Sequence, residues 1–357
     1  MNRRAPFSIE GTSVRAGGRG TVEIPIARLA TGSPVSLPVI IVHGRAEGPT
    51  IWVDAAVHGD EINGVEIIRR VLEELDPKVL RGTVLAVPVV NALGFMTGSR
   101  YLPDRRDLNR SFPGSTRGSL AGRIAELFLR EIVDRCSVGI DLHTGSDHRT
   151  NLPQIRANLD DPETLRLAHA FAPPAMVHSA TRDGSLRQAG TDAGATVLLY
   201  EGGEAWRFDE TAIRVGVSGV LRVLAALDMI DDRDAPDAQV PMICRGSTWS
   251  RARKSGIASL WAGLGDQVTK GQPIGRIHDS FGRRLAQITA RADGIVVGLN
   301  LDPIVNQGDA LVHIAFLVDT DSSASSDSSD SSDRSPTHAE SAAAGSRSDM
   351  RTKAPRS

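Results

Sequence analysis

Residues 49–75 of the 357-residue chain read PTIWVDAAVHGDEINGVEIIRRVLEEL, and they contain the features that decide the fold. An apolar run bounded by proline and glycine opens the segment and is typical of a buried strand. The spacing of Val65, Ile68 and Val71 then predicts an amphipathic helix over residues 63–75. A buried strand followed by such a helix is the repeating unit of an α/β sheet.

The same alternation continues to about residue 230. We predict strands in TVEIPIARLA, PVIIVHG, TVLAVPVVNALG, VGIDLHTG and TVLLYEGGE, and helices at residues 119–135, 162–171 and 209–229. Strands that alternate with helices predict an α/β sheet covered by helices on both faces.

Changes in composition divide the chain into four parts. Residues 1–20 are a charged, Gly-rich N-terminal segment, and residues 21–230 are the expected α/β domain. After a charged, Pro-containing linker, residues 241–318 consist of short apolar runs separated by glycine, which predicts a small all-β domain. Residues 319–357 are Ser/Asp-rich without apolar periodicity, so we expect a disordered tail.

The overall composition excludes several classes of protein. Hydrophobic residues make up 40% of the chain, and its net charge is −2, so we expect no nucleic acid or membrane partner. Cys136 and Cys244 are too far apart for a Cys-x-x-Cys site, and the N-terminus lacks the apolar core of a signal peptide. We therefore expect a cytoplasmic protein, and a homo-oligomer is compatible with the sequence.

The motif His58-Gly-Asp-Glu61 lies at the predicted strand-to-helix turn. A catalytic zinc ion takes three ligands of the His/Glu type and leaves one position for water. This motif supplies two ligands, and His143 in DLHTG is the best candidate for the third. Asp141 could orient His143, and Asp60 could orient His58.

A lone His-x-x-Glu is more often a surface turn than a metal site, so its setting matters. His58, His143 and Glu201 each follow an apolar strand-like run directly. In α/β sheets, functional residues lie at the carboxyl ends of strands. Three polar residues at three such ends are hard to explain by packing alone.

Four motifs in order carry a resemblance to a known family. They are AAVHGDEINGVEIIRRV, GSRYLPDRRDLNRSFPG, IDLHTG and LLYEGGE. Over residues 20–318 the chain resembles the succinylglutamate desuccinylase/aspartoacylase family, which is related to the zinc carboxypeptidases. The resemblance implies a carboxypeptidase-like mixed sheet flanked by helices.

The resemblance also implies a role for each matching residue. It implies one zinc ion per chain, held by His58, Glu61 and His143. It implies that Glu201 is the catalytic glutamate, that Arg100 polarises the scissile carbonyl, and that Asn109 and Arg110 grip a substrate carboxylate. An arginine suits that last task because it meets a carboxylate bidentately.

Some of these matches have neighbouring rivals. Arg105 and Arg106 compete with Arg100, and Glu204 competes with Glu201. Arg187 lies where the family makes further substrate contacts, so it is a candidate binding residue, although a helix-surface arginine is an equal alternative.

The function we expect is that of a zinc-dependent amidohydrolase that cleaves a small N-acyl amino acid. Zinc would activate water, and Glu201 would move the proton. Two alternatives stay open, namely a zinc carboxypeptidase acting on peptides and a catalytically silent binding protein with the same fold. The acyl group is not predicted.

Residues 241–318 resemble the barrel-sandwich hybrid of biotinyl and lipoyl carrier domains, through GLGDQVTKGQPIGRIHD. Carriers present a modifiable lysine at a hairpin tip. Here Lys270 precedes Gly271 inside the turn motif, and no Met-Lys-Met sequence occurs. We therefore do not expect a carrier function.

Overall fold

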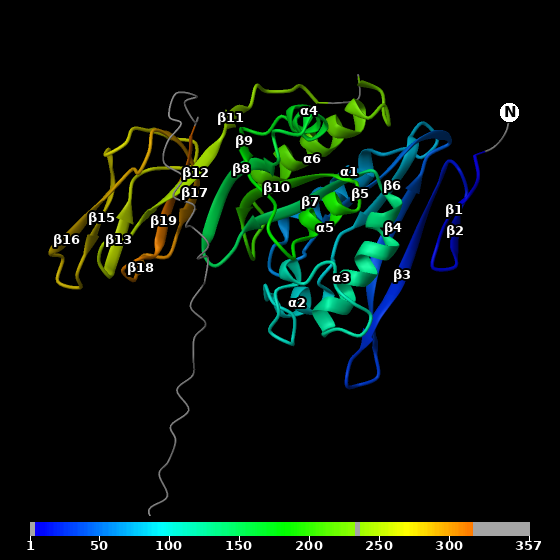
Figure 1. The fold of residues 1–357 in the computed structure, drawn as a ribbon, viewed down its shortest axis with the longest axis horizontal. Coiled ribbons are helices and arrows are strands. Elements are labelled where there is room, and N and C mark those ends of the chain that lie inside the picture. The colour runs from blue at the N-terminus through cyan, green and yellow to red at the C-terminus, as the bar shows by residue number, and fades with distance from the viewer. Residues whose placement is uncertain (1–3, 233–235, 317–357) are drawn as a thin grey trace, which may run out of the picture. The chain divides into compact units, whose positions relative to one another are not determined.

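A computed structural model of the chain describes residues 4–232 and 236–316. The predicted disordered tail at residues 319–357 lies outside these residues. The main sheet of the described part is mixed, and strands pair along it in one continuous order (Figure 1). From edge to edge these strands are β12 (Gly246–Arg251), β19 (Ala310–Phe316), β17 (Gly294–Asn300), β8 (Arg149–Ala157), β10 (Thr196–Glu204), β7 (Val138–Gly145), β5 (Ala46–Ala55), β6 (Arg81–Val87), β4 (Pro34–His43) and β3 (Gly18–Arg28).

The middle of the sheet is parallel. Strand β7 pairs in parallel with β5 on one side and with β10 on the other, and β6 continues the parallel set beyond β5. Strand β8 runs antiparallel to β10. The carboxyl ends of β5, β7 and β10 therefore meet at one edge, where ligands bind in open α/β sheets.

Helices cover both faces of this sheet, as predicted (Figure 1). Along β5, Ile51 and Val53 point into one hydrophobic core and Trp52 into the other, which is the alternation a strand imposes. The first core receives α1 (Asn63–Glu74), α4 (Pro162–Phe171) and α6 (Glu210–Ala226), and the second receives α3 (Leu120–Glu131) and α5 (Leu186–Asp192).

The predicted helices at residues 63–75, 119–135, 162–171 and 209–229 are confirmed by α1, α3, α4 and α6, although α3 ends early and a short 3₁₀ turn η2 (Val133–Arg135) follows it. In residues 4–232 and 236–316, every helix is too short or too polar to cross a lipid bilayer.

Some local structure differs from the predictions. The strand predicted in TVLAVPVVNALG ends at Val87, and helix α2 (Ala92–Thr97) begins soon after, because the side chain of Asn91 accepts a hydrogen bond from the backbone of Gly94. Helices α2 and α5 are too short to show a helical period in the sequence. The N-terminal segment contains a hairpin of β1 (Phe7–Ile9) and β2 (Thr12–Val14), which we did not predict.

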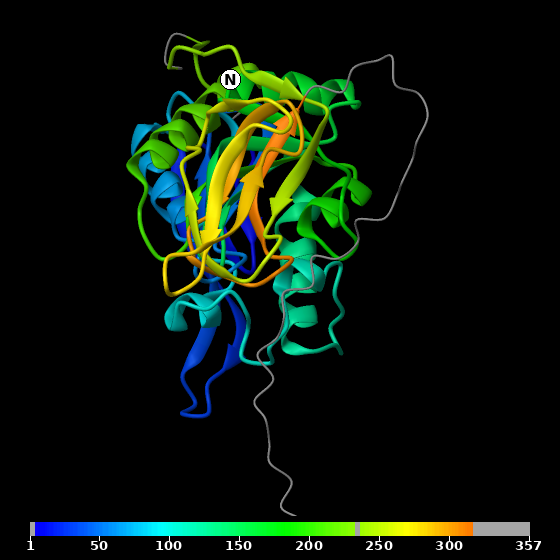
Figure 2. The same ribbon diagram turned by 90° about the vertical axis from the view of Figure 1, so that its left-hand side faces the viewer.

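The described residues after 236 form strands and no helix, as the sequence predicts (Figure 2). A separate sheet contains β16 (Arg284–Thr289), β15 (Pro273–His278), β13 (Gly256–Leu260) and β18 (Ile304–Val305). The short strands β9 (Ala175–His178), β11 (Met242–Cys244) and β14 (Gln267–Val268) pair beside the main sheet. Strand β17 pairs antiparallel with β8, so the main sheet continues into this region.

Candidate active site

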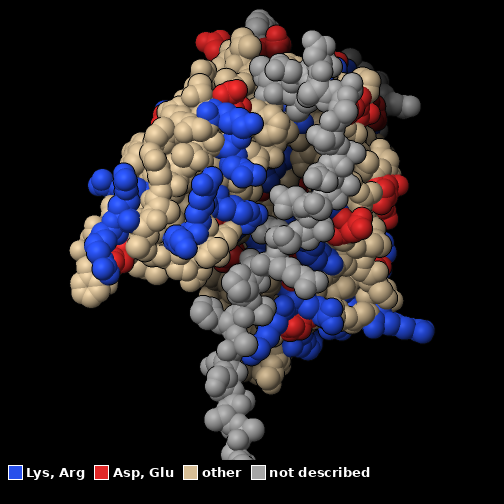
Figure 3. Space-filling view, turned by 60° about the vertical axis from the view of Figure 1, so that its left-hand side comes forward, with Lys and Arg blue, Asp and Glu red and all other residues tan. Residues whose placement is uncertain are grey.

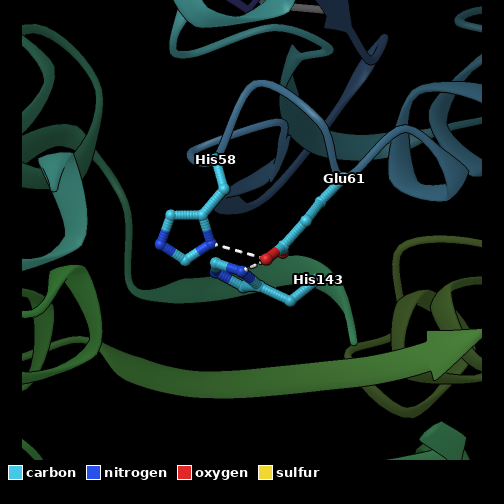
Figure 4. A group of neighbouring side chains, drawn as sticks. All are labelled: His58, Glu61 and His143. Atoms are coloured by element: carbon cyan, nitrogen blue, oxygen red, sulfur yellow. Dashed lines mark hydrogen bonds and ion pairs between the residues drawn. The ribbon is translucent and has the colours of Figure 1, made fainter. Parts of the chain in front are cut away.

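His58, Glu61 and His143 converge on one buried point (Figure 4). His58 follows β5, Glu61 lies in the turn before α1, and His143 is near the end of β7. Nδ1 of His58 lies 2.8 Å from Oε1 of Glu61, and Nδ1 of His143 lies 2.7 Å from Oε2. All three residues are at most 4% exposed. The structure thus brings together the three residues that we predicted as metal ligands.

The turn between β5 and α1 has a constrained backbone. Ala56 has a φ of 51°, which a non-glycine residue rarely adopts. A Cβ atom on Gly59 would lie 2.0 Å from the carbonyl carbon of Gly94, so only glycine lets this turn pack against α2. Held in this way, the turn presents His58 and Glu61 to the same point.

A carboxylate stands behind each imidazole. Nε2 of His143 lies 2.8 Å from Oδ1 of Asp141, and the two groups form an ion pair but not a well-aligned hydrogen bond. Nε2 of His58 lies 3.2 Å from Oδ1 of Asp107. The predicted contact of Asp141 is therefore confirmed. The expectation for Asp60 is wrong, because Asp107 occupies the place behind His58, and Oδ1 of Asp60 has no partner in the described residues.

These contacts move the pKa values of the three residues. Burial disfavours an ionised Glu61, but the two imidazoles beside it hold its pKa well below the usual range. Burial likewise opposes protonation of His58 and His143, yet the neighbouring carboxylates raise both pKa values. The carboxylates around the two imidazoles therefore favour a positive charge at this point. Two imidazole nitrogens and one carboxylate are the donor set of catalytic zinc sites, so these residues fit a zinc ion.

Arg100 lies against this cluster. Its Nη1 is 3.3 Å from Oε1 of Glu61, and its Nη2 donates to Oδ2 of Asp107 over 2.9 Å. Burial would lower the pKa of Arg100, but Asp107 and Glu61 raise it, so the guanidinium stays charged. The rivals Arg105 and Arg106 are exposed. Of the three arginines, the structure brings only Arg100 to the cluster.

Glu201 lies on β10, directly opposite His143 in the parallel register. Its Oε2 accepts a hydrogen bond of 2.8 Å from Nδ2 of Asn151 on β8. Burial raises the pKa of Glu201 above its ordinary value. The rival Glu204 instead forms an ion pair of 2.8 Å with Arg207 at the surface. Of the two glutamates, Glu201 is the one that lies opposite His143 of the cluster.

Asn109 and Arg110 lie in the 3₁₀ turn η1 (Leu108–Arg110), directly after Asp107. Oδ1 of Asn109 accepts a hydrogen bond of 2.8 Å from the backbone N–H of Leu186, at the start of α5. Arg110 is exposed. Asp107 therefore connects this turn to the cluster.

Arg187 is buried at the start of α5 rather than exposed on a helix surface. Its guanidinium donates to the carbonyl oxygens of Arg156 and Ala180 and to Oγ of Ser179. Burial, together with the charge of Arg156, lowers its pKa to about 10. These bonds anchor α5 to β8, and a substrate contact of Arg187 stays a prediction.

Asp107, Asn151 and Arg156 lie at the site but were not predicted from the sequence. Asp107 stands two residues before Asn109 in the motif DLNRSFPG, so the motif itself contained a signal. Asn151 and Arg156 carry no local signal, because they reach the site only through the pairing of β8 with β10.

The chain is similar to several known proteins. Residues 47–227, about half of the chain, match the succinylglutamate desuccinylase/aspartoacylase catalytic domain. The N-alpha-acetyl-L-2,4-diaminobutyric acid deacetylase of Halomonas elongata is 29% identical over 84% of this chain and 92% of its own.

Solved structures share the fold. A succinylglutamate desuccinylase/aspartoacylase from Rhodobacter sphaeroides has a TM-score of 0.75 and is 26% identical, over 84% of this chain and 96% of its own. The product-bound ectoine utilization protein of Ruegeria pomeroyi has a TM-score of 0.76 and is 22% identical, over 88% and 99%. The match over half of the chain, together with this shared fold, shows that the chain belongs to the succinylglutamate desuccinylase/aspartoacylase family.

Proposed function

We propose that this chain is a zinc-dependent amidohydrolase that removes the acyl group from a small N-acyl amino acid. The observation that carries the proposal is the convergence of His58, Glu61 and His143 beside Glu201, from the adjacent strands β5, β7 and β10. The similarity to a deacetylase from Halomonas elongata supports the same reaction class.

His58, Glu61 and His143 would hold the metal, one ion per chain. When bound, zinc lowers the pKa of water and polarises a carbonyl group. The carboxylates of Asp107 and Asp141 lie behind the two imidazoles and leave each Nδ1 facing the centre of the cluster. Such outer carboxylates fix ring orientation and strengthen metal binding.

Glu201 would take a proton from the attacking water and deliver it to the leaving nitrogen. Its raised pKa brings it closer to neutrality, which suits a group that must both accept and donate a proton. The hydrogen bond from Asn151 holds one carboxylate oxygen in place. The other oxygen is then the one that exchanges the proton.

Arg100 would stabilise negative charge on the carbonyl oxygen as it develops. Its guanidinium is held by Asp107 and lies beside Glu61, so it needs no reorganisation during the reaction. A cation fixed in advance where charge develops contributes more than one that must be recruited.

Asn109 and Arg110 would bind a carboxylate of the substrate and set the position of the scissile bond. Oδ1 of Asn109 is already used by α5, so its Nδ2 would be the donor. Arg110 would add a bidentate contact.

Residues 241–318 would form a small barrel-sandwich hybrid domain that limits access to the site. The pairing of β17 with β8, the strand that carries Asn151, supports this placement. Restricted access favours small acylated amino acids over peptides, and so favours the deacylase over a carboxypeptidase.

The test is a hydrolysis screen with metal content measured on the same sample. We expect one zinc per chain and hydrolysis of N-acetyl or N-succinyl amino acids. Faster cleavage of a dipeptide at its C-terminus would favour the carboxypeptidase. Protein that neither contains nor takes up zinc would favour the binding protein.

A further inference from the structure

Asp54 on β5 and Asp141 on β7 are two buried carboxyl groups that lie side by side. The two residues are partners in the parallel register of these strands, and both are 0% exposed. Because partners in a register point to the same face of a sheet, both carboxyl groups occupy one face. Figure 3 shows Asp and Glu side chains at the surface, where water solvates their charge. Burial removes that solvation from Asp54 and Asp141.

The indole of Trp52 holds Asp54 from one side. The two residues stand two positions apart on β5, so their side chains share a face. Nε1 of Trp52 donates a hydrogen bond of 2.8 Å to Oδ1 of Asp54. The register partner of Trp52 on β7 is Gly139, and a Cβ atom there would lie 2.0 Å from Cζ2 of the indole. Glycine at position 139 therefore leaves the space that seats the indole beside Asp54.

Asp141 faces groups that can carry a positive charge. Nε2 of His143 lies 2.8 Å from its Oδ1. Burial lowers the pKa of Arg187, and the negative charge of Asp141 acts against this shift. Positive charges nearby favour a carboxylate at Asp141. Asp54 is therefore the member of the pair that is better placed to carry a proton.

The hydrogen bonding of the pair is incomplete without that proton. Oδ2 of Asp54 and both oxygens of Asp141 have no hydrogen-bond partner in residues 4–232 and 236–316, although the two carboxyl groups lie within reach of each other. Burial, followed by the charge of Asp141, raises the pKa of Asp54 well above its usual range. Two neighbouring buried carboxylates repel each other, whereas one proton between them turns the repulsion into a hydrogen bond.

We propose that Asp54 is a positioning residue of the zinc site, which as a neutral carboxylic acid donates a hydrogen bond to Asp141 and so fixes the carboxylate behind His143. The inference rests on the proposed zinc-dependent function. Asp141 then lies between the acid of Asp54 and Nε2 of His143, and Nδ1 of that imidazole faces the cluster. Groups behind a metal-binding imidazole fix its orientation and strengthen metal binding.

The carboxylate behind His58 is supported in a different way. Asp107 accepts a hydrogen bond of 2.9 Å from Nη2 of Arg100. Burial opposes its ionisation, but its contacts with His58 and Arg100 hold its pKa well below the usual range. Asp107 therefore acts as an anion, whereas Asp54 acts as a neutral donor. Replacing each aspartate with asparagine should have different consequences at the two positions.

Zinc affinity, measured by competition with a chelator, tests this difference. Asp54→Asn keeps an acceptor for Trp52 and a donor for Asp141, so we expect its affinity to stay within a few fold of the parent. Asp107→Asn removes a charge and should weaken binding about 10- to 100-fold. Asp54→Leu fills a similar volume without a donor and should weaken binding about tenfold.

Two results would overturn the proposal. A loss of zinc affinity in Asp54→Asn as large as that in Asp54→Leu would mean that a neutral donor does not suffice at this position. Parental affinity in Asp54→Leu would mean that Asp54 does not position the site. If the leucine variant does not fold, the asparagine variants and the spectroscopic measurement below still decide.

Infrared difference spectroscopy detects the proton without any hydrolysis. At neutral pH, the spectrum of the parent minus that of Asp54→Asn should contain the carbonyl stretch of a protonated carboxylic acid, in the zinc-free and in the zinc-loaded protein. Zinc uptake without this band would mean that Asp54 is ionised, and would refute only this inference. Failure of the parent chain to take up zinc would refute the zinc-dependent function, and the role of Asp54 with it.

Discussion

The cluster of His58, Glu61 and His143 consists of paired opposite charges, whereas the residues around Arg156 are basic or aromatic. These neighbours are Arg149, Trp249 and His313. In the cluster, every imidazole and carboxylate meets an opposite charge within 3.3 Å, and two outer carboxylates support the rings. Arg156 forms no ion pair with a described carboxylate, although its charge opposes the burial that raises the pKa of Glu201. The first region is organised before any substrate arrives. The second places two arginines, Arg149 and Arg156, beside the aromatic rings of Trp249 and His313.

Glu201 lies opposite His143 of the cluster, and the charge of Arg156 acts on its carboxylate. Its replacement should therefore have the largest effect. Glu201→Ala removes the proposed proton carrier, and we expect kcat to fall by about a thousandfold or more while bound zinc is unchanged. Steady-state kinetics and metal analysis on the same sample measure this. Glu204→Ala, on the same strand, is the matched control and should stay within a few fold of the parent. A Glu201→Ala enzyme with parental kcat would remove the residue from the mechanism.

Breaking the charge balance of the cluster should weaken metal binding. Asp107→Ala leaves His58 without its outer carboxylate and removes one of the two ion-pair partners of Arg100. We expect zinc affinity to fall about 10- to 100-fold, measured by competition with a chelator of known affinity. Replacing the exposed Asp134 with Ala serves as the control. If both variants bind zinc as the parent does, Asp107 does not support the site.

The contact between Asn151 and Glu201 joins the two regions, and its loss should have a smaller effect. Asn151→Ala leaves one oxygen of Glu201 without its hydrogen bond. We expect kcat to fall about tenfold with little change in KM, because the bond orients the base and does not bind substrate. Asn306→Ala, at an exposed position, is the comparison. A change confined to KM would place Asn151 in substrate binding instead.

The smallest expected effect is the contribution of His313 to the pH dependence of the free energy of unfolding. The pKa of His313 is well below its usual range in the folded chain, so the unfolded chain takes up the proton first as the pH falls below about 6.5. His313 should therefore lower the free energy of unfolding by up to about 1.4 kcal/mol per pH unit below that value, until its folded pKa is reached. Above about pH 7 it should have no such effect.

Urea unfolding at pH 7.5 and 5.5 measures this difference. His313→Asn should lose less stability between the two pH values than the parent chain. His169→Asn, at an exposed site, should behave like the parent. Identical pH dependence in all three proteins would mean that His313 titrates normally when folded.

The elements that were predicted well are those whose signal is local. The helix at residues 63–75 and the buried strands show periodic apolar residues, and a period can be read without knowing any partner. The motif around His58 and Glu61 is local too, because both lie in one tight turn. By contrast, helix α2 depends on a cap by Asn91, and the hairpin of β1 and β2 is too short for a period.

The choice among rival residues needed the folded chain. Arg100, Arg105 and Arg106 are alike in sequence, and only the fold brings Arg100 against Glu61 while the other two face solvent. Asp60 and Asp107 differ in the same way, since the nearer residue in sequence is not the one that reaches His58. Closeness along the chain does not decide which side chains meet.

The sequence by itself therefore determined the α/β architecture, the candidate ligands His58, Glu61 and His143, and the resemblance to the family. These follow from period, residue type and motif order, which are all properties of short segments. Only the tertiary structure decided that Asp107 supports His58, that Asn151 holds Glu201, and that the charge of Arg156 acts on Glu201. The physical reason is that each depends on strand register or on chain segments that are distant in sequence, and electrostatic contacts act across a few ångströms of space.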